Sequence, residues 1–296
     1  MNGTDHLIKS GDYTARIAEQ GAALRELQYL GRDLVVPFEL GAPIPDYRGI
    51  IAAPWPNRIA DGAYRFNGVV QHLPLNEPDR GNALHGLVFD ALWEAERIEV
   101  DSVTMTCAVA ASKGYPTSLD LRVTYRLDPE GLHCTVEATN SGSAEAPYGV
   151  CPHPYLLAGD SLLDDWVLQF QATSYLAVTP DRLLPHSLRP VDGHEFDFRV
   201  PRAIGATMID HAFTGLGPAP RLVLSDPSGT QVGMSWDGGC PWLQIHTADK
   251  TDGSASRLGL AVEPMTCPPD AFNSGKDLIV LAPGATHAAR WCIFGA

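Results

Sequence analysis

A long run of alternating apolar and polar residues around a central turn constrains the fold most strongly. Leu, Val and Tyr residues occupy every second position of Leu119–Leu127, and the same period resumes with apolar residues from Leu132 to Ala138. The residues Asp128–Gly131 between them read Asp-Pro-Glu-Gly, a sequence typical of a turn. Because successive side chains on a strand point to opposite faces, this pattern predicts a β-hairpin with one buried face.

Shorter segments repeat this period along the chain. They are Tyr64–Phe66, which leads into an Asn67-Gly68 turn, Val103–Val109, Trp166–Phe170, and Leu222–Leu224, joined to Val232–Trp236 through Asp226–Gly229. The Asn-Gly pair favours a type I′ hairpin turn, since both central residues of that turn need positive φ. Helical periodicity is poor; Ala18–Leu30 fits it weakly, and Gly21 interrupts it.

The composition agrees with one large β-domain. The chain has 296 residues, of which 45% are hydrophobic and 19% charged, and its 24 prolines and 28 glycines are spread along the length instead of forming a linker. Sandwiches and barrels of this length are often undivided. We therefore predict an all-β fold, a single domain over residues 1–296, built as a large antiparallel sandwich or barrel.

The net charge, the apolar runs and the cysteine spacing limit which partners and which cellular location are expected. The net charge of −14 argues against nucleic acid as a partner, because binding it needs clustered Lys and Arg. No run approaches the roughly 18 apolar residues of a membrane span. Met1–Glu19 carries charges throughout and lacks the apolar region of a signal peptide, so the cytoplasm is the expected location. The six cysteines are far apart and are expected to be reduced and mostly buried.

The common signatures of nucleotide binding, activated nucleophiles and zinc proteases are missing. The chain has no G-x-x-x-x-G-K-[ST], G-x-G-x-x-G, G-x-S-x-G or H-E-x-x-H motif. Kinases, ordinary dinucleotide oxidoreductases and α/β-hydrolases are therefore disfavoured. No group of His, Cys, Asp and Glu has zinc-site spacing, so the sequence predicts neither a metal nor a cofactor.

Two ionisable residues stand in unusual settings. Glu263 ends the segment Arg257–Glu263, in which Gly259 and Ala261 would share its face of a strand and leave room for a ligand. The alternative is an edge carboxylate at a strand end, with Pro264 stopping the strand. His153 lies between two prolines that stiffen the backbone, which suits an aimed proton donor. A histidine taken alone is also compatible with a structural role.

Other polar residues lie among apolar neighbours. His85 precedes Gly86, which would permit close approach of a ligand or backbone, and the pair Asn57-Arg58 follows Ala53–Pro56. A guanidinium buried there must find a partner. Asp210 is similarly placed between Ile209 and His211. Four tryptophans could stack on a sugar but are expected in the core: Trp55, Trp93, Trp236 and Trp242.

Taken in order, these segments resemble the aldose 1-epimerase (galactose mutarotase) family. The matching stretches, which together span residues 50–275, are Asn57–Gly62 (N-R-I-x-x-G), Asn67–Asn76 (a hairpin ending in L-P-x-N), Asn82–Gly86 ([N/S]-x-L-H-G) with Phe89, Asp90 and Trp93 after it, His153–Tyr155 (H-x-Y), Asp210, Leu243–Thr247 (L-Q-[IV]-Y-T), and Glu263 with Pro269–Asn273 (E-x-x-x-x-x-P-D-A-x-N). Each motif is weak, whereas the ordered set is specific.

The resemblance implies a β-supersandwich, monomeric or homodimeric, with an open cleft for a hexose. It implies that ionised Glu263 removes the proton of the anomeric hydroxyl while protonated His153 protonates the ring oxygen. Asn57, Arg58, His85 and Asp210 would hold and orient the sugar. This chemistry needs one proton taken and one given, without metal or cofactor.

The chain also departs from the galactose-type pattern. Pro154 follows His153 where many galactose mutarotases have serine, and His246 replaces the usual tyrosine. The loop Asn76–Arg80 also differs from the common one. These departures resemble a bacterial side branch of the family, some members of which act on hexoses other than galactose.

Three rival functions remain open from the sequence. An epimerase for a phosphorylated or sulfonated hexose would need a cationic clamp, for which Arg80 or Arg182 could serve. A carbohydrate-binding protein without catalysis would have no need of Glu263 and His153 together. A glycosidase could use Glu263 with Asp210 as its carboxylate pair, leaving His153 without a role.

Overall fold

The alternating segment forms the hairpin that its pattern predicts. In the computed structural model, which describes residues 3–250 and 256–296, it comprises β12 (Leu119–Asp128) and β13 (Gly131–Asn140). Asp128 pairs with Gly131, so only Pro129 and Glu130 lie in the turn. Every second residue of β12 is buried, as the alternation requires.

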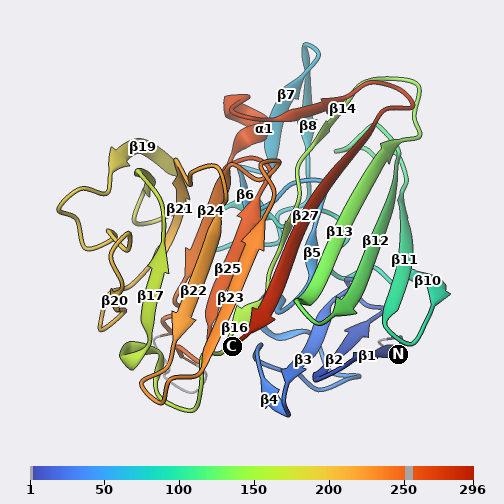
Figure 1. Cartoon of the computed structure of the whole chain (residues 1–296). Coiled ribbons are helices and arrows are strands. Elements are labelled where there is room, and N and C mark those ends of the chain that lie inside the picture. Colours follow the sequence, from blue (N-terminus) through green and yellow to red (C-terminus); the bar gives the residue numbers. More distant parts are fainter. Residues whose placement is uncertain (1–2, 251–255) are drawn as a thin grey trace.

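This hairpin belongs to a nine-stranded antiparallel sheet with the order β10-β11-β12-β13-β27-β23-β22-β17-β20 (Figure 1). The other members are β10 (Glu94–Ile98), β11 (Ser102–Val109), β27 (Thr286–Gly295), β23 (Gln231–Trp236), β22 (Arg221–Ser225), β17 (Val167–Phe170) and β20 (Arg202–Ala203). The C-terminal strand β27 therefore lies in the middle of the sheet and joins its two halves.

A six-stranded sheet packs against this one and has the order β16-β25-β24-β21-β18-β19. Its strands are β16 (Tyr155–Leu156), β25 (Leu260–Met265), β24 (Trp242–His246), β21 (Asp210–Thr214), β18 (Ser174–Val178) and β19 (Pro185–Pro190). All six residues of β25 are buried, since the strand has neighbours on both sides and is covered on both faces.

The remaining elements are small. A four-stranded sheet contains β1 (Asp5–Ser10), β2 (Tyr13–Ala18), β3 (Leu24–Tyr29) and β4 (Arg32–Asp33), and four two-stranded ladders pair β5 (Ile51–Ala52) with β15 (Cys151–Pro152), β6 (Arg58–Ala60) with β9 (Asn82–Leu84), β7 (Ala63–Phe66) with β8 (Val69–His72), and β14 (Ala146–Tyr148) with β26 (Ile279–Leu281). The described helical elements are the 3-10 turns η1 (Pro45–Tyr47) and η2 (Leu163–Asp165) and the single turn α1 (Ala271–Ser274).

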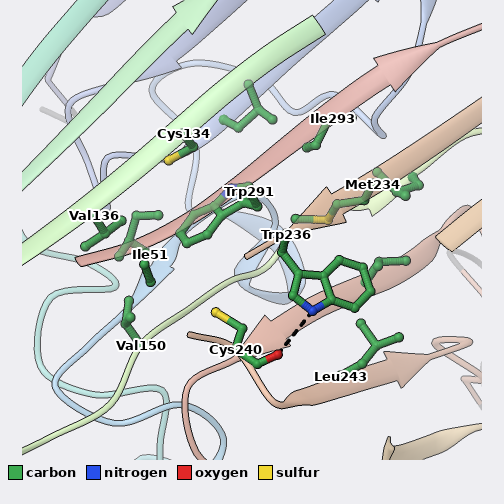
Figure 2. Close-up of a cluster of buried hydrophobic side chains, with 14 of the residues drawn as sticks. Ile51, Cys134, Val136, Val150, Met234, Trp236, Cys240, Leu243, Trp291 and Ile293 are labelled. Atoms are coloured by element: carbon green, nitrogen blue, oxygen red, sulfur yellow. Dashed lines mark hydrogen bonds between the residues drawn. The ribbon is translucent and has the colours of Figure 1, made fainter. Parts of the chain in front are cut away.

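One continuous apolar core joins the two large sheets. Figure 2 shows Trp291 of β27 and Trp236 of β23 among side chains from both layers, with Leu243 coming from β24 and Ile51 from β5. The indole N–H of Trp236 donates to the carbonyl of Cys240. Trp55, Trp93, Trp236 and Trp242 are all buried in apolar clusters, which confirms the expectation that they are core residues.

The structure confirms the predicted all-β antiparallel sandwich and most of its predicted strands. Asn67 and Gly68 both have positive φ, as a type I′ turn requires. The weak helical period at 18–30 does not form a helix, because Gly21 and Ala22 have positive φ and β3 follows. All six cysteines are free, and four of them are buried. Among the described helices, none is long and apolar enough to cross a membrane.

Candidate active site

Glu263 lies on β25, an interior strand of the six-stranded sheet between β16 and β24. Its side chain is buried, and β24 places Gln244 directly opposite. The edge-carboxylate alternative is wrong, because β25 is paired on both sides and continues through Pro264 to Met265. The expected role of Gly259 is also wrong. A Cβ there would meet Val36 at 2.6 Å, so this glycine allows close packing rather than space for a ligand.

His153 faces Glu263 from the link between β15 and β16. Its Nε2 lies 3.5 Å from Oε1 of Glu263, and both side chains are buried. Two backbone hydrogen bonds fix the segment: Gly49 N–H donates to the His153 carbonyl, and His153 N–H donates to the Ile50 carbonyl. The position of His153 is therefore fixed both by the two flanking prolines and by hydrogen bonds to its own backbone N–H and carbonyl groups.

His85 is packed edge-on against His153, with ring centroids 4.8 Å apart and an interplanar angle of 88°. His85 has φ +58° and donates its backbone N–H to the carbonyl of Asn57. A Cβ on the next residue, Gly86, would meet the Ala53 carbonyl oxygen at 2.0 Å. Gly86 thus permits close approach of the backbone, one of the two roles considered from the sequence.

Arg58, at the start of β6, is buried and paired in three directions. Its Nε and Nη2 donate to the two carboxylate oxygens of Glu77, at 2.9 and 3.0 Å. Its Nη1 lies 3.5 Å from Oδ1 of Asn57 and 3.9 Å from Oδ2 of Asp210. Asp210, on β21, accepts a hydrogen bond from Gln244 Nε2 at 2.6 Å.

All six residues singled out from the sequence line one cavity of about 180 Å³. They are Asn57, Arg58, His85, His153, Asp210 and Glu263, and the other lining residues are Asp46, Tyr47, Leu84, Tyr155, His246, Ala248 and Lys250. Sequence reasoning missed Asp46, Tyr47 and Lys250. Asp46 and Tyr47 belong to the turn η1, where both have positive φ, and no sequence motif marks this turn.

The proposed cationic clamp is not where the sequence suggested. Arg80 pairs with Glu77, and Arg182 donates to backbone oxygens of Arg80 and Gly81. Neither arginine lines the cavity. The lysine that does line it is Lys250, whose Nζ lies 2.7 Å from Oδ2 of Asp46.

Burial controls the protonation of the central groups. It raises the pKa of Glu263 well above its ordinary value, and the nearby Asp210 carboxylate raises it further. Burial lowers the pKa of His153, with His246 adding to the effect, and likewise lowers the pKa of His85. The protein alone therefore favours neutral His153 and protonated Glu263, rather than the ionised pair expected from the sequence. Both arrangements hold one proton on the pair.

His85, His153 and Glu263 also form a possible donor set for a metal, since one ligand atom from each lies within 4.8 Å of the others. Two imidazoles and a carboxylate suit divalent transition metals. Metal-bound histidines usually donate their second ring N–H to a partner. Here the Nδ1 atoms of His85 and His153 have no such partner among the described residues. Unchanged activity after EDTA treatment remains our prediction, checked by a turnover assay before and after dialysis.

Comparison with known proteins identifies the family of this chain. The aldose 1-epimerase family profile matches residues 5–292. The uncharacterized protein YihR of Escherichia coli is 36% identical over 97% of this chain and 92% of its own length. Human galactose mutarotase is 30% identical over 57% of this chain and 50% of its own length.

Solved structures agree on the fold. A Caenorhabditis elegans aldose epimerase homologue superposes with a TM-score of 0.88 at 19% identity, over 99% of this chain and 98% of the other. A putative aldose 1-epimerase of Escherichia coli K12 gives a TM-score of 0.86 at 21% identity, over 99% of both chains. The profile match spans nearly the whole sequence and includes every motif described above. The chain therefore belongs to the aldose 1-epimerase family and is an isomerase of the mutarotase type.

Proposed function

We propose that this protein interconverts the α and β anomers of a hexose by acid–base opening and reclosure of the sugar ring. The observation that carries the proposal is the buried pair of Glu263 and His153, 3.5 Å apart in a cavity that also holds Arg58, His85 and Asp210. Ring opening needs a base and an acid on neighbouring oxygens, and each well-placed transfer accelerates a reaction by roughly 10²–10⁴.

Ring opening transfers one proton to the base and one from the acid while a single C–O bond breaks. The base takes the anomeric hydroxyl proton, the O–H electrons form the C1 carbonyl, and the C1 bond to the ring oxygen breaks. The ring oxygen then takes the proton of the acid. Rotation about the C1–C2 bond and the reverse steps give the other anomer. A hydroxyl donating to Glu263 and a ring oxygen accepting from His153 both favour the proton on His153, so sugar binding selects the reactive arrangement.

A mutarotation assay tests the proposal directly. Polarimetry or NMR exchange on freshly dissolved hexoses should show catalysis above the spontaneous rate by the wild-type protein. Release of reducing sugar from glycosides would instead support a glycosidase, and sugar binding without turnover would support a binding protein. Either result would overturn the proposed activity.

A second candidate, a hexose bearing an anionic group, is favoured by the charges beside Lys250. Lys250 Nζ lies 2.8 and 2.7 Å from the two oxygens of Asp46, and Arg48 Nη2 lies 3.2 Å from one of them. Two cations thus share one carboxylate on the cavity wall. A phosphate or sulfonate on the sugar would supply a second anionic partner.

Substrate comparison separates these candidates. If the sugar is anionic, Lys250→Met should lower kcat/KM for the phosphorylated or sulfonated hexose by about tenfold or more and leave the neutral hexose little affected. Lys276→Met is the matched control, because Lys276 is exposed and pairs with Asp277 outside the cavity lining. Equal activity of the wild-type protein on neutral and anionic hexoses would exclude this second candidate.

A further inference from the structure

Glu77 touches Arg58 but does not line the cavity. The two side chains form a bidentate pair in which Nε and Nη2 of Arg58 each reach one carboxylate oxygen, at 2.9 and 3.0 Å. Asn82 Nδ2 also donates to Glu77, at 2.8 Å. Burial acts against the charged carboxylate, yet the hydrogen bonds from Arg58 and Asn82 hold the pKa of Glu77 below its ordinary value.

This pairing fixes which donors of Arg58 remain for a ligand. A guanidinium carries its N–H groups in a planar fork, so occupying Nε and Nη2 sets the orientation of the whole group. The third nitrogen, Nη1, faces Asn57 and Asp210, which both line the cavity. Arg80 Nη1 also lies 3.3 Å from Glu77 Oε1, and Asp210 Oδ2 lies 3.9 Å from Arg58 Nη1. Two arginines thus face two carboxylates, and Arg58 presents an aimed donor without a free positive charge.

A distant arginine holds the loop that carries Glu77. Arg182, between β18 and β19, donates to the Arg80 carbonyl at 2.8 Å, the Gly81 carbonyl at 2.9 Å and Asp61 Oδ1 at 2.8 Å. Its own carbonyl accepts a hydrogen bond from Asn82 Nδ2 at 3.1 Å. Asn82 is thus bonded to both Glu77 and Arg182, which connects the β18–β19 link to Arg58.

We infer that Glu77 is a positioning residue for sugar recognition, which aims Arg58 Nη1 into the cavity and cancels its charge, and that Arg182 secures the loop for this role. The inference rests on the proposed sugar-binding function of the cavity. It assigns a neutral hydroxyl, and not an anionic substituent, to the Arg58 side of the site. An anionic group would be accommodated, if at all, beside Lys250.

Three variants test the inference. Glu77→Gln keeps the shape of the side chain and removes its charge, so KM should rise about tenfold while kcat changes less than about threefold. Arg182→Met should raise KM by about threefold. Because both act through Arg58, the double variant should resemble Glu77→Gln alone, whereas independent effects would multiply. Arg32→Met is the matched control, since Arg32 also donates to backbone carbonyls, but to those of Ala158 and Gln231 and not to the loop that carries Glu77.

Inorganic phosphate provides a readout that general loosening of the fold would not produce. Uncovering the charge of Arg58 should make phosphate inhibit Glu77→Gln at about tenfold lower concentration than the wild-type protein. An unchanged KM and unchanged phosphate inhibition in this variant would overturn the inference. If Glu77→Gln does not fold, Arg182→Met decides, and an unchanged KM there overturns it.

Failure of the proposed function would look different. A wild-type protein without mutarotation would refute that function, and sugar affinity measured by calorimetry would then replace KM for the same variants. Weaker binding by Glu77→Gln would still support the inference. A wild-type protein that neither turns over nor binds any hexose would overturn both.

Discussion

Glu263 and His153 hold a single proton between them over a wide pH range. Burial raises the pKa of the carboxyl and lowers that of the imidazole, so the interval in which the pair is singly protonated is broadened at both ends. The two groups lie 3.5 Å apart and titrate as one unit. Catalysis needs one base and one acid, which only the singly protonated pair supplies.

The pH dependence of kcat/KM should therefore have two limbs around a broad plateau. On the acid side a second proton occupies His153, whose pKa is lowered, and removes the base. On the alkaline side the last proton leaves Glu263, whose pKa is raised, and removes the acid. Initial rates by polarimetry, corrected for buffer-catalysed mutarotation, measure this. A plateau that ends near neutral pH on either side would contradict the described protonation.

Removing the carboxyl of Glu263 should abolish most of the chemistry but little of the binding. Glu263→Gln keeps the shape, so kcat should fall by about 10²–10⁴ with KM changed less than about threefold. Glu137→Gln is the control, since Glu137 lies on the face of β13 opposite its buried residues and does not line the cavity. Near-normal turnover by Glu263→Gln would refute the mechanism, whatever the sugar.

Residue-level interpretation of the sequence found the residues proposed to carry the chemistry but missed the charged residues Asp46 and Lys250 on the cavity wall. Arg58, His153 and Glu263 are polar residues in apolar surroundings, and that contrast is visible locally. Asp46 and Lys250 are ordinary charged residues in loops, and only the fold brings them together. The protonation states of Glu263 and His153 could not be predicted either, because they depend on burial by segments that are distant in the sequence.

At the scale of elements, strands with one buried and one exposed face were predictable, including short ones such as β17 and β22, whereas strands without that contrast showed no alternation. β12 and β13 have one buried and one exposed face, so their residues alternate. β25 is buried on both faces and carries no alternation, and the two-residue strands β15 and β16 are too short to show a period. Those are the strands that hold Glu263 and flank His153.

The turn at Gly86 shows how the backbone positions a neighbouring side chain, His85, that lines the cavity. Gly86 has φ +81°, and a Cβ would stand 2.0 Å from the Ala53 carbonyl oxygen, which only a shift of the backbone relieves. Gly86→Ala should destabilise the protein by about 1–3 kcal/mol and displace His85. KM should rise more than in the control Gly229→Ala, because Gly229 also has positive φ but a Cβ added there would meet no atom within 4 Å. Thermal denaturation measures the loss of stability, and steady-state kinetics measure KM. A normal KM in Gly86→Ala would contradict the role assigned to the turn.

For the whole molecule, the order of strands could not be predicted from local pattern. β27 is the last strand in the sequence, yet it lies between β13 and β23 and completes the nine-stranded sheet. Tyr13 OH also accepts a hydrogen bond from the Gly295 backbone N–H, which ties the first sheet to the end of the chain. Such pairings depend on packing between distant segments, which alternation does not encode.

The central position of β27 predicts that the chain unfolds as one unit. Trp291 is 4% exposed and packs in the core that joins both large sheets (Figure 2). Trp291→Ala should therefore cost about 3–5 kcal/mol of the free energy of unfolding. If residues 1–296 fold as the predicted single domain, far-UV circular dichroism and tryptophan fluorescence should shift to the same lower denaturant midpoint. Val100→Ala, at an 81% exposed position, should leave the midpoint unchanged. Separate transitions for the two probes would show instead that parts of the structure unfold independently, which would contradict a single cooperative domain over residues 1–296.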